Sequence, residues 1–175
     1  MSETPEFSRP VDIRETGEAH RIVADEGERA ALARRFAIRS IERFEARIAL
    51  ESAGEAILAT GTINAAITQA CAVSGDDLPQ SIEEDLALRF VPEAALPAYD
   101  ADAEIELTAQ ELDDIPYSGT SIDIGEAAAQ TLALAIDPYA VGDGAEAARQ
   151  RHNLAAEGQE DGPLADLLRG ISKAD

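Results

Sequence analysis

The stretch "IERFEARIAL" (residues 41–50) decides the fold class of this chain. Apolar side chains occupy every second position from Phe44 through Ala46 and Ile48 to Leu50, and the charged Glu45 and Arg47 lie between the first three of them. Successive side chains of a strand point to opposite faces, so an apolar period of two is typical of a half-buried strand. The stretch therefore predicts a strand with one face on a core and one face in water.

Two further stretches repeat this pattern and predict a sheet. Residues 57–71 alternate after the turn "ESAGE", and residues 82–90 alternate after "SGDDLP". Gly61 lies inside the first of these stretches and indicates a bend or bulge there. Three strands joined by short turns predict an antiparallel meander with one wet face.

The segments on either side of the meander predict helices that pack on it. In residues 26–37 acids precede the alanines and arginines follow them, which is the charge order that a helix dipole favours. Residues 121–124 predict a short strand, and a helix over residues 125–136 follows it and ends before Pro138. We therefore predict an α+β fold: a twisted antiparallel sheet that could close toward a barrel, one or two packed helices and a flexible C-terminal tail.

The composition changes after the second helix. Residues 141–162 are rich in Gly, Ala and charge, which predicts a linker with room for one short helix near residues 144–155. We predict one α+β domain over residues 1–140, followed by a flexible linker with a short amphipathic segment over residues 141–175. The apolar residues of that segment either clip onto the domain or dock on a partner: Leu164, Leu167, Leu168 and Ile171.

The formal net charge of −21 restricts where a nucleic acid could bind, because binding needs clustered Lys and Arg. Between Arg47 and Arg149 the only basic residue is Arg89. From Arg29 to Arg47, six arginines lie within nineteen residues that hold only two acids. They are the candidate contacts for RNA or a partner protein: Arg29, Arg34, Arg35, Arg39, Arg43 and Arg47. The alternative is that they pair with acids of the same domain.

The sequence shows no catalytic or metal-binding motif. His20 and His152 lie in different segments, and no glycine-rich phosphate loop or nucleophile elbow occurs. Cys71 is the only cysteine, so it has no partner thiolate for structural zinc. We expect no enzyme activity, metal, cofactor or small-molecule substrate. An enzyme that uses convergent carboxylates is the alternative that a structure can test.

Cysteine content and hydropathy predict the compartment. One cysteine cannot form an internal disulfide and fits a reducing environment. No apolar window long enough to span a bilayer occurs, and "MSETPEFSRP" lacks the order of a secretory signal. We expect a cytoplasmic protein with no membrane partner.

The order of these parts resembles the YceD-type large ribosomal RNA subunit accumulation proteins. The resemblance is strongest in "IDIGEAAAQTLALAIDPY", which is similar to the family's Ile-Asp-Leu element, helix and leucine-proline ending. The matching positions are Ile122, Asp123, Gly125, Glu126, Leu132, Leu134 and Pro138. The tail "GPLADLLRGISK" is similar to the family's closing motif. Many proteins of the family that this chain resembles have a Cys-x-x-Cys pair at the hairpin turn. At the same positions this chain has Cys71 and Ser74.

The resemblance implies a bacterial, non-enzymatic ribosome-biogenesis factor that supports 23S rRNA processing or accumulation. Its partner would be large-subunit rRNA or its precursor, or a ribosome-assembly protein. Since the shared motifs survive without the second cysteine, the resemblance implies no metal requirement here. The charge distribution confines RNA contact to the arginine-bearing N-terminal surface. An acidic protein-protein adaptor without direct RNA contact is the alternative.

Overall fold

The computed structural model describes residues 5–95 and 114–152. The chain divides into two compact units, of which the first comprises residues 1–69 and 79–137, and the second residues 70–78 and 138–175. The first unit holds the sheet core with two α-helices. The second holds a hairpin turn and one short helix.

The main sheet has five strands in the order β2-β3-β4-β5-β6. Its central strands are long: β3 spans Ser40–Ala53, β4 spans Ala56–Ala70 and β5 spans Asp77–Pro92. The edge strands are short, with β2 at Ala19–Val23 and β6 at Asp114–Tyr117. Strand β3 pairs antiparallel with β2 and β4, whereas β6 runs parallel to β5. Within the described residues the sheet keeps two edges, so it is open and not a closed barrel.

A second, two-stranded sheet pairs the N-terminal segment with a segment more than a hundred residues later. Strand β1 (Pro10–Asp12) lies antiparallel to β7 (Ser121–Asp123), with Val11 opposite Ile122.

The turn of 3₁₀-helix η1 (Glu93–Ala95) follows the main-sheet strand β5.

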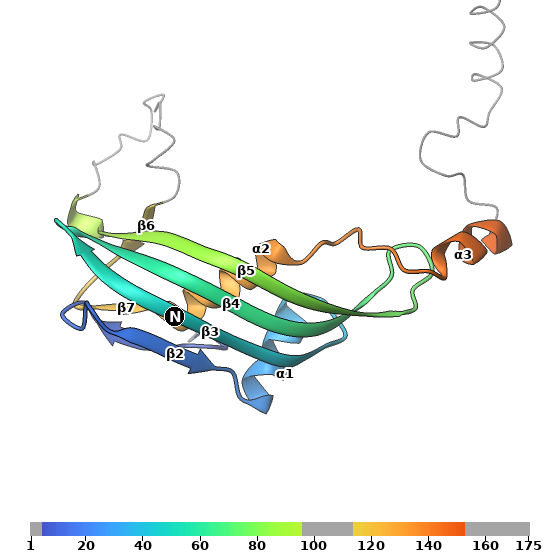
Figure 1. The fold of residues 1–175 in the computed structure, drawn as a ribbon, viewed down its shortest axis with the longest axis horizontal. Coiled ribbons are helices and arrows are strands. Elements are labelled where there is room, and N and C mark those ends of the chain that lie inside the picture. The colour runs from blue at the N-terminus through green and yellow to red at the C-terminus, as the bar shows by residue number, and fades with distance from the viewer. Residues whose placement is uncertain (1–4, 96–113, 153–175) are drawn as a thin grey trace, which may run out of the picture. The chain divides into compact units, whose positions relative to one another are not determined.

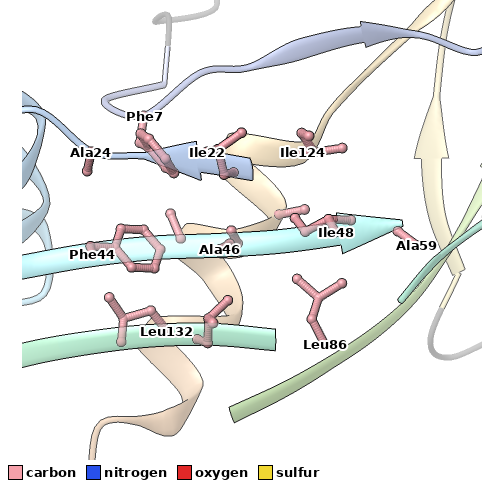
Figure 2. Close-up of a cluster of buried hydrophobic side chains, with 14 of the residues drawn as sticks. Phe7, Ile22, Ala24, Phe44, Ala46, Ile48, Ala59, Leu86, Ile124 and Leu132 are labelled. Carbon is pink, nitrogen blue, oxygen red and sulfur yellow. The ribbon is translucent and has the colours of Figure 1, made fainter. Parts of the chain in front are cut away.

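Two helices cover one face of the main sheet. Helix α1 spans Glu26–Arg35 and α2 spans Ile124–Ala135, and Figure 1 shows both on the same side of the strands. The aromatic rings of Phe7 and Phe44 meet at 5.2 Å between centroids in the core below them. Figure 2 shows these rings with the surrounding apolar side chains, including Leu132 of α2.

Small side chains make close packing of α2 possible. Ala127, Ala128 and Ala129 are buried next to Leu132, so the helix presents a flat surface to the core. Burial of apolar area stabilises the folded state by about 25 cal/mol per Å². The small alanine side chains bury such area because they let the helix backbone pack closely against the core. The core therefore forms although the chain is poor in large apolar residues.

The α+β prediction and the three strands of the meander are confirmed, and both predicted helices occur within two residues of their expected ends. Of the bend or bulge predicted at Gly61, a bulge against β3 is wrong. The pairing of β3 with β4 runs unbroken through Ile48 and Gly61, and the irregularity lies between Ile41 and Arg43. A Cβ at position 61 would lie 1.9 Å from the Arg47 carbonyl oxygen, so the glycine permits a close approach of two strands.

The second unit includes α3 (Ala145–His152), which lies where the sequence allows one short helix inside the predicted linker. Ala145 and Ala148 of this helix are buried. The predicted boundary at residue 140 and the flexible linker stay predictions. The four apolar tail residues lie outside the described part of the chain.

Candidate nucleic-acid interface

Helix α1 carries three of the six candidate arginines and is capped at both ends by hydrogen bonds. At its start, the Asp25 carboxylate accepts from the Glu28 amide at 2.9 Å and the Glu28 carboxylate accepts from the Asp25 amide at 2.8 Å. This capping box satisfies two amides that a helix start leaves without partners. At its end, Ala37 adopts a left-handed φ of 55°, and Ile38 donates to the Ala33 carbonyl at 3.0 Å.

Two of the candidate arginines are tied to the fold. Arg35 donates to both carboxylate oxygens of Glu126 on α2, at 2.7 and 2.9 Å, and to Glu6 at 3.1 Å. The hydrogen bonds to Glu126 raise the pKa of Arg35, and they lower the pKa of Glu126. Arg29 donates to the Ala24 carbonyl at 2.7 Å. Both side chains join α1 to its surroundings, which makes them weak candidates for an RNA contact.

A groove of about 470 Å³ lies between α1 and the start of β3. Arg29, Arg34 and Arg39 line it together with Ser40, over an apolar floor that includes Ile38. Arg34 is exposed and forms no salt bridge with any described residue. The groove therefore brings three candidate arginines together, with Arg34 the most available of them.

The last two candidates lie on the other face of the main sheet. Phe44, Ala46 and Ile48 point into the core, so the alternation of β3 turns Arg43 and Arg47 outward. We call this side, which α1 and α2 do not cover, the outer face. Arg43 and Arg47 are exposed there and form no salt bridge with the described residues.

The structure adds one arginine that the sequence analysis missed. Arg21 of β2 stands directly opposite Arg47 and donates to Glu45 at 2.6 Å. Hydrogen bonding to Arg21, and more weakly the charges of Arg43 and Arg47, lowers the pKa of Glu45. A short apolar piece at residues 22–23 marks β2 in the sequence, but which strand it would pair with is not visible there.

Charge changes from strand to strand across the outer face. Next to the arginines, β4 presents neutral polar side chains, with Thr62 opposite Arg47 and Asn64 opposite Glu45. Beyond β4, strand β5 exposes Glu83 and Asp85. The outer face thus runs from a basic edge through a neutral strand to an acidic strand.

The motif with the strongest family resemblance is structural. Asp123 caps α2 by accepting from the Gly125 and Glu126 amides at 3.0 and 3.1 Å, and it also accepts from the Ser8 hydroxyl and the Arg9 amide at 2.5 and 2.8 Å. A Cβ at Gly125 would lie 2.5 Å from the Phe7 carbonyl oxygen. These residues fasten the N-terminal segment to α2, so they position the core and are not free for a ligand.

The hairpin turn of the second unit holds the single cysteine. The Sγ atom of Cys71 accepts from the Ser74 and Gly142 amides, each at 3.4 Å. These hydrogen bonds, led by the one from Gly142, lower the pKa of the thiol to about 6. Among the residues described, no group of three or more His, Cys, Asp or Glu is arranged to hold a metal ion.

No helix within residues 5–95 and 114–152 is long and apolar enough to cross a membrane.

Comparison with known proteins gives one match. The family model described as "Large ribosomal RNA subunit accumulation protein YceD" matches residues 59–165, which is more than half of the chain. No curated protein and no solved structure matches the chain. The matched region begins within β4, so the arginines of α1, β2 and β3 precede it.

Proposed function

Because the chain belongs to the YceD family, whose name implies a role in accumulation of large-subunit ribosomal RNA, we propose that this protein is a non-enzymatic ribosome-biogenesis factor. The family match is the observation that carries the proposal. The finer role is support of 23S rRNA processing or accumulation in the cytoplasm of a bacterial cell. The partner is large-subunit rRNA or its precursor.

The distribution of arginines supports direct contact with RNA. Arg34 in the groove and Arg43 and Arg47 on the outer face form no salt bridge with the described residues. The chain has 14 basic residues against 35 acidic ones, and these three arginines are nevertheless not neutralised by a described acid. Such side chains are available to replace the counterions of an RNA backbone.

The acidic side of the molecule supports a second candidate, an adaptor that recruits a basic ribosome-assembly protein without touching RNA. Glu83 and Asp85 are exposed side by side on the outer face of β5. Complementary charge would steer a basic partner to this strand.

Depletion of the protein from its own cells tests the proposed role. Ribosomal subunits are separated on a gradient, and the ends of large-subunit rRNA are mapped. We expect fewer large subunits and more unprocessed precursor, both restored by the wild-type chain. Unchanged subunit profiles and unchanged rRNA ends would reject the proposed role in either form, direct or adaptor.

A further inference from the structure

On the outer face of β2 and β3, positively charged side chains lie close enough to repel one another. This repulsion raises the free energy of the folded protein when nothing is bound to the face. Arg21 and Arg47 are directly opposite each other on neighbouring antiparallel strands. Like charges at such positions repel, and here a single carboxylate, Glu45, bonds to only one of the two. Arg43 adds a third positive charge two residues from Glu45 on the same face.

From this arrangement we propose that the outer face of β2 and β3 binds the phosphate backbone of a single-stranded segment of large-subunit RNA. The contact residues are Arg21, Arg43 and Arg47. The inference deepens the proposed function and rests on it, because the family role in rRNA accumulation is what selects RNA among anionic partners.

Phosphate fits these side chains chemically. A guanidinium donates two parallel hydrogen bonds to phosphate oxygens, and an anion placed between Arg21 and Arg47 removes their repulsion. Neighbouring strands lie about 4.8 Å apart, so the hydroxyl of Thr62 and the amide of Asn64 on β4 are within reach of the sugars and base edges of the same strand.

The acids of β5 limit the width of the bound nucleic acid. Strand β5 is two strands away from β3, which is about 10 Å and close to the Debye length at physiological salt. A double helix presents two phosphate backbones, and one of them would lie over Glu83 and Asp85. One backbone over β2 and β3 avoids this repulsion, so a single strand is favoured.

The outer face has little means of reading sequence. The described outward positions of β2, β3 and β4 carry no aromatic side chain on which bases could stack. Guanidinium planes can stack on bases, but they do so for any base. The expected binding is therefore salt-sensitive and tolerant of sequence.

The groove beside α1 is the competing location. Of its three arginines, Arg29 donates to the Ala24 carbonyl, and Glu26 contributes an acid to the lining, just as Arg21 donates to Glu45 on the outer face. The two faces can be tested separately because the core-facing residues of β3 separate them.

Three double variants of equal charge change separate the surfaces. The outer-face pair is Arg43→Gln with Arg47→Gln, and the groove pair is Arg34→Gln with Arg39→Gln. The matched control in the second unit is Arg149→Gln with Arg151→Gln. Each full-length purified chain is titrated, over a series of salt concentrations, with a single-stranded large-subunit rRNA fragment, the same fragment annealed to its complement, and polyglutamate.

We expect the wild-type chain to bind the single strand with an affinity that falls as salt rises. Loss of two phosphate contacts should lower the slope of log affinity against log salt by about 1.4, since each contact to a single strand contributes about 0.7. Only the outer-face pair should show this change. The duplex and polyglutamate should bind more weakly than the single strand.

Several results would overturn the inference. One is a slope of log affinity against log salt that is unchanged in the outer-face pair, and another is a decrease in this slope confined to the groove pair. A third is binding of duplex or polyglutamate that equals or exceeds binding of the single strand. A wild-type chain that binds no RNA would also overturn it, whereas the proposed function would then stand or fall on the depletion experiment alone. Circular dichroism of each variant checks that the fold is kept.

Discussion

Neighbouring arginines of α1 have different roles that the sequence does not distinguish. Arg34 and Arg35 follow each other in an arginine-rich stretch, yet only Arg35 reaches Glu126, ninety-one residues further along the chain. No local pattern signals such a long-range partner. Whether each candidate arginine pairs with an acid of the same domain is therefore decided only by the structure, residue by residue.

Arg35→Gln should lower the free energy of unfolding at neutral pH, whereas Arg34→Gln should leave it almost unchanged. The Arg35 and Glu126 side chains are 34% and 20% exposed, so solvent screening limits the expected loss to about 1 kcal/mol. Urea unfolding of both variants measures it. Equal losses in the two variants would contradict the assignment of Arg35 to the fold.

The loss caused by Arg35→Gln should also depend on pH. Arg35 lowers the pKa of Glu126 in the folded chain below the ordinary value of 4.5. The stabilisation is therefore complete above that ordinary value and disappears as the pH falls through the lowered, folded pKa. Wild type and variant should converge in stability in acid, and a difference that stays constant down to that range would show that the ion pair is not its cause.

Cys71 offers a second residue-scale test because it is the only thiol. Two backbone amides donate to its sulfur and lower its pKa to about 6, so its ultraviolet thiolate absorbance should rise around that pH. An ordinary thiol would titrate near 8.5. Because the pKa of the thiol is lower in the folded chain, the thiolate stabilises the folded state at pH values above the pKa of the unfolded chain. This stabilisation is lost as the pH falls through about 6.

The Cys71→Ser variant is the control for this titration, since it should show no absorbance change in the same range. A wild-type midpoint close to 8.5 would contradict the hydrogen-bonded thiolate at the hairpin turn.

Elements with a strong local period are the ones that the sequence predicts correctly. Strands β3, β4 and β5 each show apolar alternation over many residues, and α1 has its capping box and charge order. The short strand predicted at residues 121–124 is confirmed as β7 (Ser121–Asp123), but its pairing with β1 has no local signal. Strands β1 and β6 are only three and four residues long, and segments far from them in the sequence pair with them. The parallel pairing of β6 with β5 has no local signal, so the predicted sheet was purely antiparallel.

The N-cap of α2 does more than start a helix, and a matched pair of variants can show this. Asp123→Ala should lose the cap, worth about 1 kcal/mol, together with the bonds to Ser8 and Arg9. Asp25→Ala removes the α1 cap but none of the bonds that join Asp123 to Ser8 and Arg9. Amide exchange should therefore rise at Arg9 in the first variant alone.

If both variants raise exchange at Arg9 to the same degree, Asp123 acts only as a helix cap. If Asp123→Ala is no less stable than Asp25→Ala in urea unfolding, the added contacts with the N-terminal segment contribute nothing measurable.

At the scale of the whole molecule, the net charge is a poor guide to its surfaces. The sequence shows that arginines concentrate before residue 48, whereas acids are spread along the whole chain. It does not show that β2 and β3 place one arginine group on the outer face while α1 places another beside a groove, because that division depends on strand pairing and helix packing. The candidate surface was predicted as one patch, and the structure places its members on two sides of the sheet.

The acidic strand β5 should weaken RNA binding to the outer face by simple repulsion. Strand β5 lies two strands from β3, which is about 10 Å. A pair of unit charges at that separation interacts by about 0.4 kcal/mol in water before screening. The double variant Glu83→Gln with Asp85→Asn should therefore bind single-stranded rRNA about two-fold to four-fold more tightly at low salt, and duplex RNA should gain more than the single strand does. The control changes two acids of the second unit, Asp143→Asn with Glu146→Gln, which removes the same charge. Equal gains in both variants would mean that only net charge matters, whereas a gain confined to the β5 variant would locate the bound RNA beside that strand.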